Sequence, residues 1–315
     1  MKIGVGIIGY GHIAKKHEQA IAESTNFQLL KTSNQFSVPS ILEDTQIKLV
    51  VVSNPSGAHA KSVIQALNEQ KQVLVEKPMA LNSTDCEAMI KAAKQAQKKL
   101  FVVKQNRFNQ PIKDLKIALK KGLFGKVFQL EVNGFWNRNE AYYKNSNWRG
   151  TKALDGGILF NQFSHFIDIL YFLFGEINPI KTKLGNYNHP YIEFEDTVNA
   201  IFQTASGAQG ALNCSTNATN QNMEGSLTVF AEKATIKIGG KYLNKIEYLQ
   251  LDKSIEKDIK HLKLFESDTE EVPNNHFAVY QSVFKALNGE EDKTLASAKE
   301  GKAVVEIIEK FYAAQ

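Results

Sequence analysis

The pattern of apolar and polar positions changes character near the middle of the chain. In the first hundred residues, short apolar runs at 2–9, 47–53, 73–79 and 99–104 alternate with helical stretches. Apolar strands separated by helices predict a doubly wound parallel sheet, which is buried on both faces. The second half has a long alternating strand at 126–136 and five further strand-like segments between residues 197 and 251, a run that predicts a mostly antiparallel sheet.

A chain of 315 residues is long enough for two domains. We therefore expect an α/β protein with a dinucleotide-binding domain at 1–122 and a second α/β domain at 123–315, where two helices, at about 275–288 and 296–314, close the chain. The reason for expecting a dinucleotide is the turn after the first strand, Gly9-Tyr-Gly11-His-Ile-Ala14. Gly9 permits the tight turn, Gly11 lets the backbone approach a pyrophosphate, and the following helix offers free N–H groups.

The region after this motif is shortened. A second strand at 27–34 ends in Thr32, Ser33 and Asn34, where a carboxylate that binds the adenosine ribose is expected. A full crossover helix is also missing before the next strand. Without the carboxylate a 2′-phosphate is repelled less, but no arginine stands nearby to hold it. NAD is the expected cofactor, and NADP stays open.

Two later turns also follow strands of the predicted parallel sheet. One is Ser53-Asn-Pro-Ser-Gly-Ala-His59, and the other is Glu76-Lys77-Pro78. Proline disfavours the α region for the residue before it, so Lys77 is expected to be extended at a strand's carboxyl end. Ligands bind at that edge of an open parallel sheet.

Together these motifs resemble those of the Gfo/Idh/MocA oxidoreductases. The resemblance implies a Rossmann domain, then a domain with a large open sheet, and hydride transfer between a nicotinamide cofactor and a sugar or polyol. It also implies that Lys77 lies at the substrate hydroxyl. The predicted cofactor-binding residues are Gly9, Gly11, His12, Ile13, Ser33, Asn34, Ser53, Asn54, Pro55, His59, Glu76, Lys77, Gln105 and Arg107.

The substrate chemistry is expected between residues 136 and 168. On one continuous helix Asn161, His165 and Asp168 would share a face, and a histidine with polar partners there is a candidate acid or base. The family commonly has an aspartate where this chain has Asn161, which leaves the acid–base work to Lys77 and His165. The predicted catalytic residues are Lys77, His165 and Asn161, and the predicted substrate-binding residues are Lys77, Arg107, Tyr143, Trp148, Arg149, Asn161, Gln162 and His165.

The motifs of this region are similar to one branch of the family, the UDP-N-acetylglucosaminuronate 3-dehydrogenases of bacterial surface-polysaccharide synthesis. Arg149 would then pair with the sugar carboxylate. A free-sugar or inositol dehydrogenase is the alternative within the class. The shortened region motivates another alternative, a non-catalytic sensor or scaffold. Cofactor retained through purification would favour the enzyme.

Composition and charge limit the kinds of partner that we expect for this protein. The net charge is +5 and the lysines are scattered, so no nucleic-acid footprint is predicted. No apolar segment is long enough to span a membrane. Two distant cysteines indicate neither a disulfide framework nor a metal site and favour a reducing, cytoplasmic setting. An open sheet needs its uncovered face buried, so we expect a homodimer or homotetramer.

Overall fold

The computed structural model describes residues 2–33, 38–266 and 275–315. The chain is divided into two compact units. The first comprises Met1–Gln105, Lys152–Gly156 and Asn274–Glu306, and the second comprises Asn106–Thr151, Gly157–Pro273 and Ile307–Gln315. The sequence predicts a single boundary between residues 122 and 123, and the observed division differs from it. The chain re-enters the first unit near its C-terminus, and the helix after Gln105 packs with the second unit.

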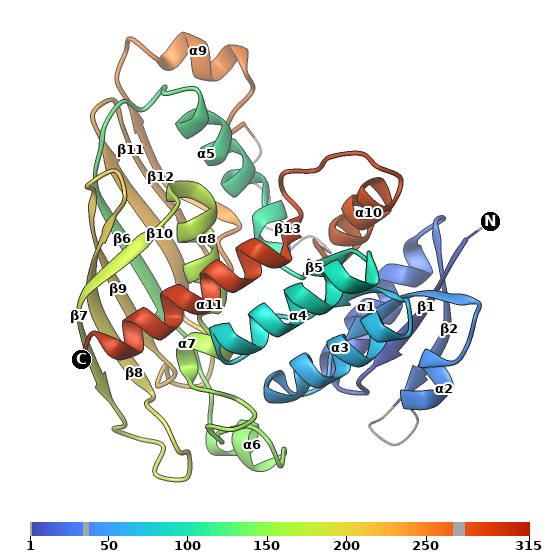
Figure 1. Ribbon diagram of the computed structural model, residues 1–315. Helices are drawn as coiled ribbons and strands as arrows, with labels where there is room; N and C mark the ends of the chain where they lie inside the picture. Colours follow the sequence, from blue (N-terminus) through green and yellow to red (C-terminus); the bar gives the residue numbers. More distant parts are fainter. Residues whose placement is uncertain (1, 34–37, 267–274) are drawn as a thin grey trace. The chain divides into compact units, whose positions relative to one another are not determined.

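The first unit is built on a six-stranded sheet (Figure 1). Its strands are β1 (Ile3–Ile8), β2 (Phe27–Ser33), β3 (Ile47–Val52), β4 (Gln72–Val75), β5 (Leu100–Val102) and β13 (Ala296–Ser297). The order is β13-β5-β4-β3-β1-β2, and all pairs are parallel except β13 with β5. The predicted doubly wound parallel sheet is confirmed, with an added antiparallel edge strand.

Helices cover both faces of this sheet. They are α1 (His12–Glu23), α3 (His59–Asn68), α4 (Ser83–Ala96), α10 (Asn275–Leu287) and the first part of α11 (Ala298–Ala313). The strand order reverses direction between β1 and β3, and such crossovers are right-handed. Therefore α1 lies on one face and α3 and α4 on the other; α10 packs against α1, and α3 against α4. The carboxyl ends of β1 and β3 form the switch point where ligands bind in such sheets.

The stretch after β2 is short, as the sequence predicts. Among the residues described between β2 and β3, one helix is present, α2 (Val38–Leu42). Asn34 lies outside the described residues. Ile41 and Leu42 of α2 are buried, so this short helix still covers part of the sheet.

The second unit carries a seven-stranded sheet in the order β12-β11-β10-β6-β9-β8-β7. Its strands are β6 (Val127–Phe135), β7 (Ile177–Gly185), β8 (Thr197–Thr204), β9 (Gln209–Ser215), β10 (Glu224–Ala231), β11 (Ala234–Gly239) and β12 (Lys245–Leu251). Every pair is antiparallel except β6 with β9, so the predicted mostly antiparallel sheet is confirmed. Strand β7 was not predicted from the sequence, and its pairing is irregular between Pro179 and Lys181.

Helices lie along one side of this sheet in Figure 1. The helical segments of the second unit are η2 (Gln105–Phe108), α5 (Gln110–Lys120), α6 (Glu140–Lys144), α7 (Ile158–Asn161), α8 (Ser164–Phe174), α9 (Glu256–His261) and the end of α11. Along β8, Val198 and Phe202 are buried whereas Asn199 is exposed, the alternation of a sheet covered on one face. On the open face, Asn199 donates to Asn213, which donates to Asn133 on the next strand.

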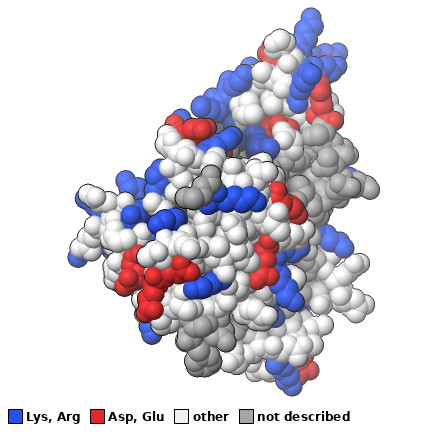
Figure 2. Space-filling model, turned by 90° about the vertical axis from the view of Figure 1, so that its right-hand side faces the viewer, with Lys and Arg blue, Asp and Glu red and all other residues white. Residues whose placement is uncertain are grey.

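Charged side chains are mixed on the surface. The face drawn in Figure 2 shows basic and acidic groups interspersed. A membrane-spanning helix, long and apolar throughout, does not occur in the described part of the chain.

Candidate active site

The glycine turn of the first unit connects β1 to α1. Gly9 has φ +131°, and a Cβ there would lie 2.6 Å from the backbone of Ser53, so only glycine fits beside the end of β3. Gly11 caps α1, and a Cβ on it would meet nothing within 4 Å. His12 and Ile13 form the first turn of α1, which has no side-chain cap. An open approach to uncapped helix N–H groups fits a dinucleotide pyrophosphate.

Three predicted cofactor residues each bury an unpaired side-chain oxygen. They are the Oγ atom of Ser33 and the amide oxygens of Asn54 and Gln105, none of which has a hydrogen-bond partner among the described residues. Ser33 ends β2, and the other two follow β3 and β5. Buried polar atoms are normally paired. Three such oxygens after strands of one parallel sheet therefore fit a polar ligand such as NAD.

His59 joins two of the loops at this edge. Its ring is 1% exposed, and its nitrogens lie 2.9 Å from the carbonyl oxygen of Asn54 and 2.8 Å from that of Pro78. Burial lowers the pKa of His59. Both ring nitrogens face backbone carbonyl oxygens, and the neutral ring donates its single N–H to one of them. His59 therefore packs between the loops after β3 and β4, and a direct cofactor contact gains no support. Pro55 caps the short helix η1 (Ser56–Ala58) in the same loop.

Gly57 lets a distant segment lie against that loop. Its N–H donates to the carbonyl oxygen of Leu154, and a Cβ at Gly57 would come within 2.0 Å of the Ala153 oxygen. The segment Lys152–Gly156 therefore belongs to the first unit although its neighbours in sequence belong to the second.

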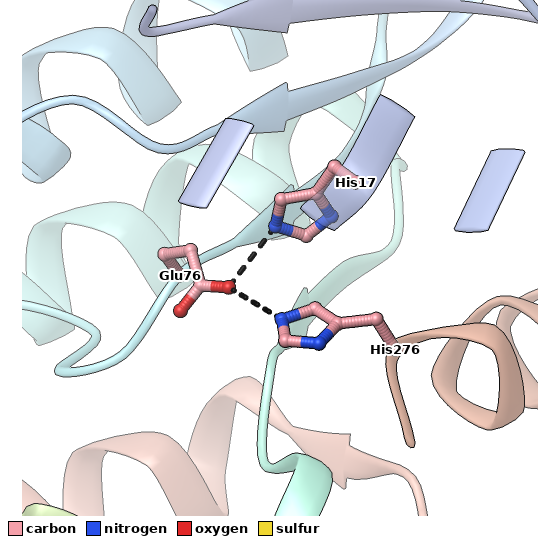
Figure 3. A group of neighbouring side chains, drawn as sticks. All are labelled: His17, Glu76 and His276. Atoms are coloured by element: carbon pink, nitrogen blue, oxygen red, sulfur yellow. Dashed lines mark hydrogen bonds and ion pairs between the residues drawn. The ribbon is translucent and has the colours of Figure 1, made fainter. Parts of the chain in front are cut away.

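Lys77 follows β4 and is half-buried, next to the fully buried Glu76. Figure 3 shows His17 of α1 and His276 of α10 pointing at one oxygen of Glu76. Their Nε2 atoms lie 3.0 and 3.4 Å from Oε1, while Oε2 accepts the backbone N–H of Lys77 at 3.0 Å. Burial pushes the pKa of Glu76 upward, but the hydrogen bonds from His17 and His276 together outweigh it and hold that pKa well below its usual range.

The same three side chains are a group that could hold a metal ion. Their ligand atoms lie within 4.8 Å of one another, in the part of the chain that the structure describes. Imidazole and carboxylate groups are suitable zinc ligands. The short separations from Oε1 are hydrogen-bond distances, however, so the present arrangement is that of a hydrogen-bonded cluster.

In the second unit, Asn161 and His165 lie on two helices instead of one. Asn161 ends α7, and His165 is in the first turn of α8. The expectation of one continuous helix is therefore wrong. The start of α7 is held by Glu195, whose Oε1 atom accepts the N–H of Ile158 at 3.0 Å and the hydroxyl of Tyr312 at 2.6 Å. Glu195 thus has a structural role at the start of α7.

Arg107 is held by Asp168. The guanidinium is fully buried and donates from Nε at 2.9 Å and from Nη2 at 2.8 Å to the two carboxylate oxygens. It also lies over the ring of Phe172 at 4.7 Å. This bidentate pair links η2 to α8. The geometry favours a structural role for Arg107, and its predicted contacts with cofactor and substrate gain no support from it.

Two other guanidinium groups lie on one tyrosine ring. The Cζ atom of Arg149 is 4.2 Å from the ring centre of Tyr142, and that of Arg138 is 5.0 Å from the same centre. Their Nε atoms are buried without partners, and neither side chain has a carboxylate partner within the described ranges. The ring of Trp148 lies 5.5 Å from Arg149. This pair of half-buried, unneutralised cations fits an anion.

Neighbouring residues support this pair. Gln162 is buried, donates to the Tyr142 hydroxyl at 3.3 Å and leaves its own oxygen unpaired. The Tyr143 ring packs edge-on against Tyr142 at 5.0 Å. The Nδ1 atom of His189 lies 3.0 Å from a carboxylate oxygen of Asp196, and its Nε2 atom lies 2.6 Å from the carbonyl oxygen of Arg138. His189 therefore fixes the backbone at Arg138.

Sequence reasoning missed Arg138, His17, Tyr280 and His189. Arg138 stands only two residues after the alternating strand, close to the aromatic motif, so its position was a usable signal. His17 is on the buried side of α1, five residues after the start of that helix. No local pattern reveals its partners, because they are 59 and 263 residues away along the chain.

Comparison with known proteins identifies the class. Residues 19–104 match the oxidoreductase family with an NAD-binding Rossmann fold, and residues 112–237 match the GFO/IDH/MocA C-terminal domain. The chain belongs to the Gfo/Idh/MocA oxidoreductase family, and its first unit is an NAD-binding Rossmann unit.

Individual relatives refine this placement. The chain is 30% identical to the WlbA dehydrogenase from Bordetella pertussis, in complex with NADH and UDP-GlcNAcA, with 99% of this chain and 95% of that chain covered and a TM-score of 0.92. The WlbA dehydrogenase from Chromobacterium violaceum, also with NADH and UDP-GlcNAcA, is 30% identical over 99% and 93% of the two chains, at a TM-score of 0.87. A myo-inositol 2-dehydrogenase from Thermotoga maritima is 27% identical over 55% of each chain. The first curated relatives are matched over only 49%, 43% and 38% of their own lengths.

Proposed function

We propose that this protein is an NAD-dependent dehydrogenase that oxidises a secondary hydroxyl of a sugar, namely C3 of a UDP-linked N-acetylated glucuronic acid used in surface-polysaccharide synthesis. Such substrates and NAD occur in the cytoplasm, a location consistent with two buried cysteines that form no disulfide. NADP stays an alternative cofactor, because β2 ends at Ser33 without a carboxylate.

The observation that carries the proposal is the pair of cations on Tyr142. A neutral polyol gives Arg138 and Arg149 no counter-charge, whereas a sugar acid linked to a diphosphate brings a carboxylate and phosphates. Both kinds of group accept two parallel bonds from a guanidinium. The likeness to two structures that contain NADH and UDP-GlcNAcA supports the same substrate class.

The residues of this chain have complementary roles in the proposed reaction. Bound NAD would supply the acceptor for the hydride that leaves the carbon carrying the hydroxyl. His165 takes the hydroxyl proton, which leaves a carbonyl group on the sugar. Lys77 donates a hydrogen bond to the same oxygen and stabilises the negative charge that develops there. Asn161 orients the sugar, and because an amide accepts no proton, His165 is the base.

A titration tests the substrate class. NADH and NADPH are added to the purified protein while nicotinamide fluorescence is followed, with and without a UDP-sugar acid. Tight binding of one cofactor, strengthened by the UDP-sugar acid, is the expected result. Cofactor binding that does not change when a UDP-sugar acid is added would indicate a simpler polyol as the substrate, as in the inositol dehydrogenase relative. Failure to bind either cofactor would favour the non-catalytic sensor or scaffold.

A substitution tests the proposed base. His165→Ala should reduce kcat by about 10²-fold or more, because general base catalysis contributes at least that much, while the Kd for NADH stays within about twofold. The measurements are steady-state turnover and fluorescence titration on the same preparation. Equal losses in turnover and in cofactor affinity would contradict the role of His165.

We also propose a homo-oligomer formed through the open face of the seven-stranded sheet. Ile201, Phe230 and Tyr248 are 52%, 38% and 53% exposed, and the strand register places all three on that face. A two-fold interface brings the same surface of both copies together, so these three apolar side chains would be covered by the other copy.

A further inference from the structure

The buried cluster around Glu76 has an orientation that its chemistry determines. Burial lowers the pKa of His17, so this ring is neutral and has one N–H to donate. Burial and the Glu76 charge raise the pKa of Tyr280 well above its usual value, so its hydroxyl keeps its proton. Because Glu76 is ionised, the His17 Nε2–H points at its carboxylate. The Nδ1 atom of His17 then accepts the Tyr280 hydroxyl, 3.0 Å away.

This chain of hydrogen bonds ends at the residue assigned to the substrate hydroxyl. The Glu76 oxygen that faces away from the histidines accepts the backbone N–H of Lys77. Tyr280 and His17 are fully buried, and their rings pack edge-on at 5.8 Å. Neither side chain can therefore contact solvent or a ligand. Among the described hydrogen bonds, theirs lead to Lys77 through Glu76.

We propose that His17 and Tyr280 are positioning residues for Lys77: through Glu76 they fix the backbone from which the Lys77 ammonium reaches the substrate. The proposal rests on the proposed function for the role of Lys77 in turnover. A displacement of about 1 Å in such a group can reduce the rate about 10²-fold. An ionised Glu76 is required, because a protonated carboxyl group is a weaker acceptor for the Lys77 N–H.

The titratable groups that face Glu76 come from four elements. They are His17 of α1, His59 of α3, His276 and Tyr280 of α10, and the adjacent Lys77. Removing His17 leaves the burial that raises the pKa of Glu76 and takes away one of the donors that lower it. The pKa of Glu76 must then rise, so Glu76 loses its charge as the pH falls through a higher value than in the wild type.

The test compares His17→Leu with His17→Gln, because glutamine can still donate an N–H toward Glu76. We expect His17→Leu to lower kcat about ten- to a hundredfold and to move the acid limb of the kcat–pH profile upward. His17→Gln should keep that limb at its wild-type position. The Kd for NADH should be the same in all three proteins. A loss of kcat that is independent of pH in both variants would reduce His17 to a packing role and overturn the proposal.

A second pair of variants controls for the loss of a buried hydroxyl from α10. Tyr280→Phe removes the donor to His17, whereas Ser282→Ala removes a hydroxyl that donates to Asp292 outside the cluster. We expect kcat to fall several-fold in Tyr280→Phe only. Equal kcat values in these two variants would exclude Tyr280 from the positioning chain.

The chemical shift of the Lys77 amide proton provides a readout that does not depend on activity. Because this proton is bonded to Glu76, it should report the Glu76 titration, which should appear at higher pH in His17→Leu than in the wild type. If the wild-type protein is inactive but the Glu76 titration still moves to higher pH in His17→Leu, the proposed function is refuted and the positioning chain is supported. An unchanged titration would refute the positioning chain. Stoichiometric zinc in the wild type that is lost in His17→Gln would also overturn it, by making these side chains metal ligands.

Discussion

Replacing Asp168 with asparagine tests whether Arg107 is structural. The side chain of Asp168 is 2% exposed and that of Arg107 0%, so the variant leaves a guanidinium buried without its counter-charge. Removing one partner of a buried ion pair costs about 3–5 kcal/mol. The amide oxygen of asparagine can still accept one of the two N–H bonds, so we expect the lower end, about 3 kcal/mol. With a urea m-value of about 2–3 kcal/mol/M, the unfolding midpoint should fall by about 1 M or more.

Tryptophan fluorescence isolates the relevant transition. The chain has two tryptophans, Trp136 and Trp148, and both belong to the second unit, as do Arg107 and Asp168. Urea unfolding followed at the tryptophan emission therefore reports the unit in which the ion pair lies. Glu140→Gln is the matched control, because its ion pair with Lys144 is exposed in the same unit and should leave the midpoint unchanged.

A double variant, Arg107→Leu with Asp168→Leu, separates the buried charge from the loss of the side chains. It should recover much of the stability that Asp168→Asn loses, since apolar replacements of a buried pair are often neutral. If Asp168→Asn leaves the midpoint within about 0.3 M of the wild type and instead weakens binding of NADH or the sugar, Arg107 is a ligand-binding residue and the reasoning fails.

Three further predictions address other parts of the molecule. Arg138→Gln should raise the KM for an anionic sugar about tenfold or more, with little change for a neutral one, because a hydrogen bond to a charged group contributes about 1.5–3 kcal/mol; equal changes in KM for both sugars would contradict an anion site. The pKa of Asp196 is lowered: burial raises it, but hydrogen bonds led by that from His189 outweigh burial. The ionised Asp196 therefore stabilises the fold above about pH 4, the usual aspartate pKa, and this stabilisation is lost as the pH falls through the lowered pKa. The free energy of unfolding should consequently fall less steeply with decreasing pH in Asp196→Asn than in the wild type; an unchanged slope would count against this interpretation. Ile201→Lys should reduce the molecular mass measured by light scattering to that of a smaller assembly, and an unchanged mass would place the contact elsewhere.

Most of the first unit could be predicted because its signals are local. An apolar strand, a glycine turn and a helix follow one another directly at 3–23, so periodicity and turn chemistry are enough to place them. Strand β7 was missed for an equally local reason. The β7 segment contains Pro179 and four exposed positions, so it lacks the alternation of apolar and polar residues that the neighbouring strands have.

The candidate site was only partly predictable, because several of its side chains are paired over long distances in sequence. Lys77, Asn161 and His165 stand in motifs, and the cations on Tyr142 are near an aromatic motif. The cluster around Glu76 is different: His276, which bonds to Glu76, and Tyr280, which bonds to His17, are some 200 residues further along the chain than Glu76. The start of α7 is likewise held by side chains that are distant in sequence, Glu195 and Tyr312.

The return of the chain to the first unit affects the order in which the protein can fold. Strand β13 and helix α10 come from the last 41 residues, yet they complete the edge of the parallel sheet and supply the hydroxyl that His17 binds. During synthesis, β1 to β5 leave the ribosome with β5 still unpaired on one side and the inner face of α1 uncovered. An exposed strand edge is a template for pairing with other chains. The nascent Rossmann unit therefore depends on the second unit being made before its own sheet is closed.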